Sequence, residues 1–179
     1  LADVPLGPFV RLDRSRSDGV EAELLCERCK LRGAHVGDCA PVKAIRIHED
    51  GGPEVLRYED APDPEPRPGE VLVRLRAASL NHLDLWVRKG LPSVPKPRIL
   101  GADGAGLRED TGERVVINPG IEHGEKITVV GEHMDGTHAE LVAVPETNVY
   151  PLPDGISFEE AAAFPLVFET AYRLLVTKA

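Results

Sequence analysis

Two stretches of the sequence carry side chains whose types and spacing could do chemistry. Asn81, His82 and Asp84 form a polar cluster among apolar neighbours, directly after the clearest strand pattern in the chain. Loops beyond strand ends are where folds commonly present binding and catalytic groups. Asn81 or Asp84 could equally cap a short helix, because both side chains accept hydrogen bonds from the first helical amides. The residues alone leave both interpretations open.

The second stretch holds all three cysteines of the chain. Cys26, Cys29, His35 and Cys39 could together hold a zinc ion in a small module. Residues 1–41 carry 6 basic and 7 acidic side chains, and no aromatic side chain lies close to the cysteines. The segment therefore lacks the charge and the stacking surface that bind nucleic acid. A segment with no metal and no site of its own is the alternative, and we favour it.

A third pattern, Gly101-Ala-Asp-Gly104-Ala-Gly106, has the wrong order for the G-x-G-x-x-G fingerprint of dinucleotide-binding folds. A short loop and another strand pattern follow it, whereas the fingerprint opens a long helix. We interpret it as a glycine-rich strand and bend. His133 and His138 flank the turn at Asp135 and Gly136, and we expect both to be surface residues.

Alternating apolar and polar residues predict a chain dominated by short strands. A helical turn is predicted over 81–89, and Ser157 with Glu160 forms a capping box that begins a C-terminal helix. Pro165 should interrupt this helix and leave a second segment over 166–177. The predicted strands are 42–48, 55–58, 70–79, 99–107, 113–118, 126–130, 137–144 and 148–150.

Length and composition restrict the function classes. A chain of 179 residues suits about one domain with an appendage, and 42% hydrophobic residues are enough for a packed core. The net charge of -9 disfavours nucleic-acid binding by the whole surface. No apolar run approaches the ~18 residues of a membrane helix, and the first ten residues lack a signal-peptide pattern. We expect a cytoplasmic protein that binds neither membrane nor nucleic acid.

From Val42 onward, several blocks occur in a characteristic order. They are VKAIRIHEDGGPEVLRYEDAPDPEPRPGEVLVRLRAASLNHLDLWVRKG, ILGADGAG, GERVVINPG, GEHMDGTHAELVAVPETNVYPLPDGISFEEAAAFPL and FETAYRLL. In this order they resemble the GroES-like catalytic domain of the medium-chain dehydrogenase/reductase superfamily. Quinone oxidoreductases and alcohol-dehydrogenase-like proteins of the zinc type are the most similar members.

The resemblance implies a mainly β fold over residues 42–179: a GroES-like β-barrel with a short active-site helix and a C-terminal linking helix. Residues 1–41 are unmatched, and we expect disorder or a translated upstream stretch there. No G-x-G-x-x-G follows the linking helix before Ala179, so we expect the Rossmann domain to be missing from this chain.

The implied activity is hydride transfer between NADP or NAD and a small carbonyl, quinone or alcohol. The resemblance also implies a homo-oligomer at full length, with this chain alone inactive. A non-catalytic GroES-like binding or structural remnant is the alternative.

Three positions bear on catalytic zinc. The zinc-dependent branch has cysteine at the position of Asn81, histidine at that of Ala102, and cysteine or an acid near Leu166. We therefore expect no catalytic zinc. In the zinc-free branch, the residues matching Asn81 and Asp84 line the nicotinamide pocket, which makes them the expected catalytic residues. Asn81 and Thr170 are the expected cofactor contacts.

Two segments of the barrel are shorter than in the family. Only LREDT separates Gly106 from Gly112, and residues 121–130 hold none of the cysteines of a structural zinc lobe.

Overall fold

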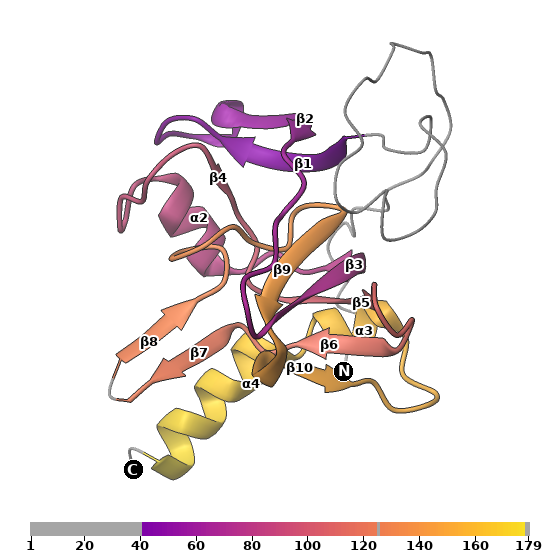
Figure 1. The fold of residues 1–179 in the computed structure, drawn as a ribbon. Coiled ribbons are helices and arrows are strands. Elements are labelled where there is room, and N and C mark those ends of the chain that lie inside the picture. The colour runs from indigo at the N-terminus through magenta and orange to yellow at the C-terminus, as the bar shows by residue number, and fades with distance from the viewer. Residues whose placement is uncertain (1–40, 125, 178–179) are drawn as a thin grey trace, which may run out of the picture.

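The computed structural model describes residues 41–124 and 126–177, which form ten strands and a few short helices (Figure 1). The alternative metal ligands Cys26, Cys29, His35 and Cys39 lie outside the described residues. The expected mainly β domain, with a short helix after its longest strand and a helix near its C-terminus, is confirmed. No helix of the described part is long and apolar enough to cross a membrane.

A small antiparallel sheet begins the fold. β1 (Val42–Ile47) lies between β2 (Leu56–Ala61) and β4 (Arg98–Ile99), and a turn of 3-10 helix over Pro53–Val55 joins the first two strands. Alternation places Val42 and Ala44 in the interior. No strand forms over residues 62–67, where proline recurs at every second position and cannot donate to a sheet.

The larger sheet has five antiparallel strands. Their order is β10 (Val149–Pro151), β6 (Arg114–Ile117), β5 (Gly104–Arg108), β3 (Glu70–Ala78) and β9 (Leu141–Pro145). One face of the sheet contributes Val71, Val73 and Leu75 to the largest apolar cluster of the described residues. The Ala44–Ala139 bridge and the bond from the Ile45 amide to the His138 carbonyl join the two sheets.

The pairing of β3 with β5 contains a bulge. Leu75 lies opposite Gly106, but Ala77 lies opposite Ala105, so Arg76 is one residue in excess on β3. A bulge bends its strand and re-aims the residues that follow. Here those residues are the polar cluster after the strand.

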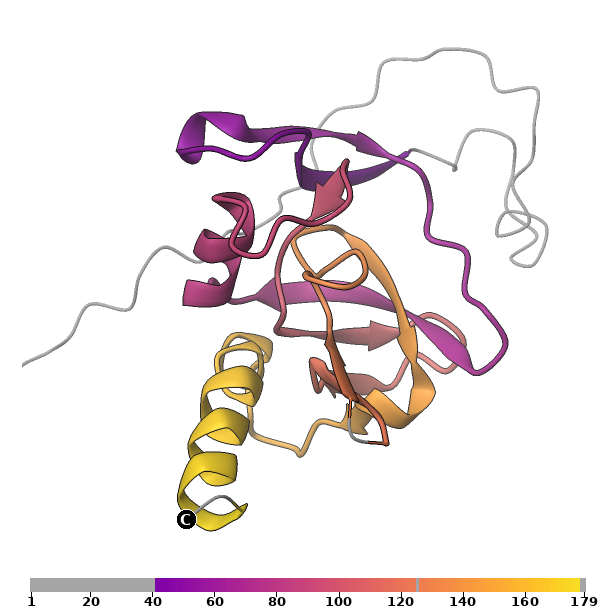
Figure 2. The same cartoon turned by 90° about the vertical axis from the view of Figure 1, so that its left-hand side faces the viewer.

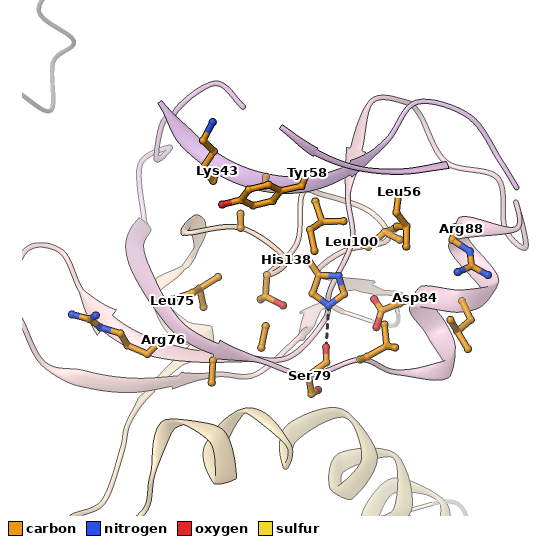
Figure 3. Close-up of a pocket in the computed structure, with 18 residues that line it drawn as sticks. Lys43, Leu56, Tyr58, Leu75, Arg76, Ser79, Asp84, Arg88, Leu100 and His138 are labelled. Carbon is orange, nitrogen blue, oxygen red and sulfur yellow. Dashed lines mark hydrogen bonds between the residues drawn. The ribbon is translucent and has the colours of Figure 1, made fainter. Parts of the chain in front are cut away.

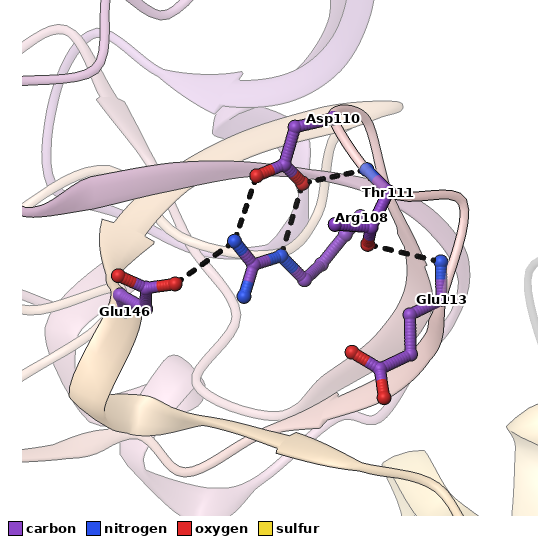
Figure 4. A network of polar contacts seen from close by, with 5 residues as sticks. All are labelled: Arg108, Asp110, Thr111, Glu113 and Glu146. Atoms are coloured by element: carbon purple, nitrogen blue, oxygen red, sulfur yellow. Dashed lines mark hydrogen bonds and ion pairs between the residues drawn. The ribbon is translucent and has the colours of Figure 1, made fainter.

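The shortened LREDT segment still closes a hairpin between β5 and β6 (Figure 4). The Arg108 guanidinium pairs with Asp110 at 2.7 Å and with Glu146 at 2.9 Å, and the Gly112 amide donates to the Arg108 carbonyl. Gly112 has φ +74°, a conformation that glycine adopts without strain. The sheet is therefore continuous despite the short connection.

Residues 120–129 form a hairpin of β7 (Gly120–His123) and β8 (Lys126–Val129). The sequence predicted β8 but not β7, because the segment GIEH has only one apolar side chain from which to read an alternation. The prediction of one strand over 99–107 was also wrong. This segment divides into β4 (Arg98–Ile99) and β5 (Gly104–Arg108), because Gly101, with φ +98°, breaks the extended chain.

Three helices complete the described part. α2 (His82–Arg88) follows β3, and α3 (Phe158–Ala162) and α4 (Pro165–Tyr172) are separated at the predicted proline. A π-helical turn over Arg173–Thr177 continues α4. The small sheet lies on one side of β3, and α3 and α4 lie on the other (Figures 1 and 2).

The predicted capping box is confirmed and carries a testable contribution to stability. Ser157 Oγ accepts from the Glu160 amide at 3.1 Å, and Glu160 Oε2 accepts from the Ser157 amide at 2.8 Å. Ser157→Ala should lower the free energy of unfolding by about 1 kcal/mol, measured by urea titration. The exposed Ser93→Ala, whose hydroxyl donates to Asp50 and accepts from Lys96 on the surface, is the control. If the two substitutions lowered the free energy of unfolding equally, the capping box would contribute no more stability than an ordinary surface hydrogen bond.

Candidate functional site

The polar cluster after β3 caps α2, and hydrogen bonds join it both to the start of this helix and to the loop before β5. Asn81 is the N-cap, and its amide donates to Asp84 Oδ2 at 2.7 Å. Asp84 Oδ1 accepts from the Gly101 amide at 2.8 Å, and the carboxylate is buried. Both oxygens of Asp84 are therefore bonded to backbone amides. This side chain holds the helix start against the loop before β5.

A second carboxylate, Asp103, is the point where three segments meet. Its Oδ2 accepts from Asn81 Nδ2 at 3.0 Å and from Ser79 Oγ at 3.2 Å, and its Oδ1 accepts from the Leu166 amide at 3.0 Å. Its carbonyl oxygen accepts from the buried Thr137 hydroxyl at 2.7 Å. Asp103 thus joins the end of β3, the start of α2 and the first turn of α4.

Burial dominates the electrostatics of Asp103. It raises the pKa of this carboxyl from an ordinary value of 3.8 to about 6, and the nearby Asp84 acts in the same direction. The hydrogen bonds from Asn81, Leu166 and Ser79 oppose the rise because they favour the charged form. The carboxyl can therefore change its charge within the mildly acidic range.

A pocket of about 280 Å³ opens between the small sheet and the end of β3 (Figure 3). Its lining is mostly apolar, with His138, Ser79 and Asp84 among the polar exceptions. His138 Nε2 lies 3.1 Å from the Ser79 carbonyl oxygen. Asn81, Asp103 and Thr170 do not line this pocket. α3 and α4 lie on the other side of β3.

Comparisons with known proteins identify the family in which this arrangement occurs. Residues 67–154 match the alcohol dehydrogenase GroES-like domain. The chain is 40% identical over 134 residues to a quinone oxidoreductase of Pseudomonas aeruginosa, which covers 74% of the chain and 40% of that protein. It is 38% identical over 146 residues to the mouse synaptic vesicle membrane protein VAT-1 homolog-like, covering 80% of the chain and 34% of that protein.

A solved NAD-dependent alcohol dehydrogenase superposes with a TM-score of 0.72 at 46% identity, over 76% of this chain and 47% of that one. The chain belongs to the medium-chain dehydrogenase/reductase superfamily. Its described part is the GroES-like domain that the sequence predicted. The chain spans well under half the length of each of these two relatives.

Within this GroES-like domain, the expected site residues lie at different depths. Asn81 is half-buried and Asp84 is buried, and the two are bonded to each other. Thr170 is exposed on α4, and no hydrogen bond among the described residues joins it to Asn81. The helix that carries it is nevertheless tied to Asn81 through Asp103 and the Leu166 amide. The roles of these three residues toward a cofactor remain predictions.

Sequence reasoning missed Asp103, although it examined the glycines around it. A carboxylate between closely spaced glycines in an apolar stretch is the signal that could have marked a buried acid. His138 was expected on the surface, but it is half-buried and lines the pocket. The reason is tertiary: residues 138–140 pair with β1, and this pairing holds His138 beside the small sheet.

The residues around Asp103 do not fit a three-ligand zinc site. The three positions that the resemblance compares with zinc ligands hold an amide (Asn81), a buried methyl group (Ala102) and a leucine (Leu166). Within the described residues, no group of three histidine, cysteine or acidic side chains could hold a metal. The Asp103 oxygens are used by Ser79, Asn81 and the Leu166 amide.

Proposed function

We propose that this domain forms the nicotinamide-facing half of an NAD(P)-dependent oxidoreductase. The reaction would be hydride transfer between the nicotinamide ring and a small carbonyl, quinone or alcohol, without catalytic zinc. One observation carries the proposal: Asn81, at the end of β3, is held rigidly by Asp103, which also holds the first turn of α4.

The orientation of the Asn81 amide supports this role. Its Nδ2 donates to Asp103 Oδ2 at 3.0 Å and to Ser79 Oγ at 3.3 Å, so the nitrogen end is turned toward Asp103. The oxygen Oδ1 is the opposite end of the amide. Because Oδ1 points away from Asp103, this oxygen can accept a hydrogen bond from the carboxamide of a bound nicotinamide. The cofactor supplies the hydride, and a fixed acceptor orients its ring.

Exposed apolar side chains on α4 and the following turn support a contact with a cofactor-binding domain. Phe164 and Phe168 stack at 4.1 Å between ring centroids, and both are more than half exposed. Val167, Tyr172 and Leu175 are also exposed. Clustered exposed apolar side chains commonly mark an interface. A nicotinamide-binding domain on this face would bring its ligand toward Asn81 and Thr170.

The test is a chimera in which residues 42–177 replace the matching segment of the Pseudomonas aeruginosa quinone oxidoreductase. We expect the chimera to oxidise NADPH or NADH with 1,4-benzoquinone and to keep its rate after treatment with a zinc chelator. Asn81→Ala should lower kcat/KM about tenfold, as expected for loss of one hydrogen bond to the cofactor. Thr170→Ala should lower it severalfold.

Thr147→Ala, at an exposed threonine between β9 and β10 and outside the proposed contact, is the matched control and should leave turnover unchanged. Circular dichroism checks that each variant is folded. A folded chimera that uses neither nucleotide, or an Asn81→Ala variant with unchanged turnover, would favour the alternative of a binding or structural domain.

A further inference from the structure

The hydrogen bonds to the Asp103 carboxylate all run in one direction. Asn81 Nδ2 donates to Asp103 Oδ2 at 3.0 Å and to Ser79 Oγ at 3.3 Å, and the Ser79 hydroxyl donates to the same Oδ2 at 3.2 Å. The Leu166 amide donates to Oδ1 at 3.0 Å. A charged carboxylate only accepts, so each of these donors is turned toward Asp103. One side chain therefore sets the direction of the whole cluster.

Burial makes these bonds costly to break. Asp103 is fully buried, so a donor that turned away would leave a buried acceptor unsatisfied. The Thr137 hydroxyl donates to the Asp103 carbonyl oxygen and leaves the carboxylate to the other donors. Asp84, the neighbouring carboxylate on α2, accepts from two backbone amides. With a pKa of about 6, the Asp103 carboxyl is mostly charged above neutral pH.

The donors on the two sides of the carboxylate differ in how far they can adapt. The Leu166 amide belongs to the backbone in the first turn of α4, where amides have no partner within the helix and cannot rotate. The Asn81 amide can reverse by a half-turn about χ2, and the Ser79 hydroxyl can rotate to accept. A reversed Asn81 still leaves the Asp84 amide bonded to the Asn81 carbonyl oxygen at 3.1 Å. Asn81 is therefore the group whose orientation depends on Asp103.

We propose that Asp103 is a positioning residue whose carboxylate determines which end of the Asn81 amide faces away from the cluster. A charged Asp103 turns Nδ2 inward and Oδ1 outward. An amide at position 103 would use its oxygen for Leu166 and present its NH₂ group to Asn81, which would then reverse. The positioning role rests on the proposed function for the purpose of Oδ1, which is to accept from the nicotinamide carboxamide.

The orientation is measured by NMR on the full 179-residue chain at pH 8. Because Asn81 Nδ2 lies 3.3 Å from Ser79 Oγ, the wild type should show an NOE between the Asn81 side-chain amide protons and the Ser79 β-protons. In Asp103→Asn this NOE should disappear, and the new amide at position 103 should show one to Ser79 instead. Asp154→Asn, at an exposed aspartate, is the control and should keep the wild-type NOE.

The second measurement exchanges the two groups. In Asn81→Asp combined with Asp103→Asn, the amide at position 103 donates to one oxygen at position 81, and the other oxygen faces outward as an acceptor. In the chimera described above, each single substitution should lower kcat/KM about tenfold, and the pair should return it to within about threefold of the wild type. This arm decides the question even if Asp103→Asn alone does not fold.

Failure of this inference differs from failure of the proposed function. A chimera that uses neither nucleotide contradicts the proposed function, and the NOE still decides the orientation. If Asn81→Ala lowers turnover in the chimera but Asp103→Asn does not, the positioning role alone is overturned. Absence of the NOE in the wild type, its persistence in folded Asp103→Asn, or a double variant no more active than the single variants would overturn it as well.

Discussion

Val73→Asp should leave the domain unfolded at room temperature. Val73 is fully buried in β3, an interior strand of the larger sheet, among Val71, Val142 and Val144. An unpaired carboxylate there must lose its hydration or be neutralised, and the valine contacts are lost as well. The combined cost exceeds about 4 kcal/mol, a large part of the 5–15 kcal/mol that typically stabilises a domain.

The measurement is the dispersion of amide resonances together with thermal unfolding followed by circular dichroism. Arg76→Asp is the matched control, because it also places an aspartate in β3 but at an exposed position. It should change the stability by no more than about 0.5 kcal/mol. A Val73→Asp chain that keeps a cooperative transition near the wild-type temperature would contradict the described core.

Asp103→Asn should remove a large part of the pH dependence of stability. The folded carboxyl has a pKa of about 6, raised from 3.8 by burial. Between pH 3.8 and about pH 6, Asp103 holds a proton in the folded state that it has released in the unfolded state. Stability is therefore greatest below about pH 4 for this group and falls by about 3 kcal/mol as the pH rises through 6, at about 1.4 kcal/mol per unit.

Urea titrations at pH 4, 5, 6 and 7 measure this slope. Asparagine keeps the size of the side chain but cannot ionise, so the variant should lose the decline attributed to Asp103. Asp154→Asn, at an exposed aspartate, should keep the wild-type profile. Parallel profiles for the wild type and Asp103→Asn would show that the buried carboxyl does not titrate in this window.

Local patterns predicted the elements that depend on neighbours in sequence. The alternation over 70–79 became β3, and the Ser157 box begins α3. The polar cluster was placed correctly at the start of α2, because Asn81 and Asp84 have the spacing of a helix cap. These features need only the period of a strand or one turn of helix.

The features that depend on long-range pairing could not be read from the sequence. Asp103 bonds to an amide 63 positions later, and His138 to a carbonyl 59 positions earlier. The strand predicted over 137–144 begins only at Leu141, because the preceding residues bridge to β1. The Asp103 cluster therefore depends on how α4 meets the start of β5, and the position of His138 depends on how the segment before β9 meets β1.

The bulge at Arg76 has an evolutionary consequence. If the pairing of Leu75 with Gly106 continued without it, Ala78 would lie level with Asp103; with it, Ala78 pairs with Gly104 and the Ser79 amide meets the Asp103 carbonyl. A one-residue deletion here would move the whole polar cluster out of reach of its carboxylate. The turn over residues 109–113 lies at the other end of β5 and makes no bond to Asp103 or Asn81. A change of length in that turn would leave Asp103 in register with Ser79 and Asn81, whereas the residue count between Leu75 and Asn81 is fixed by the site.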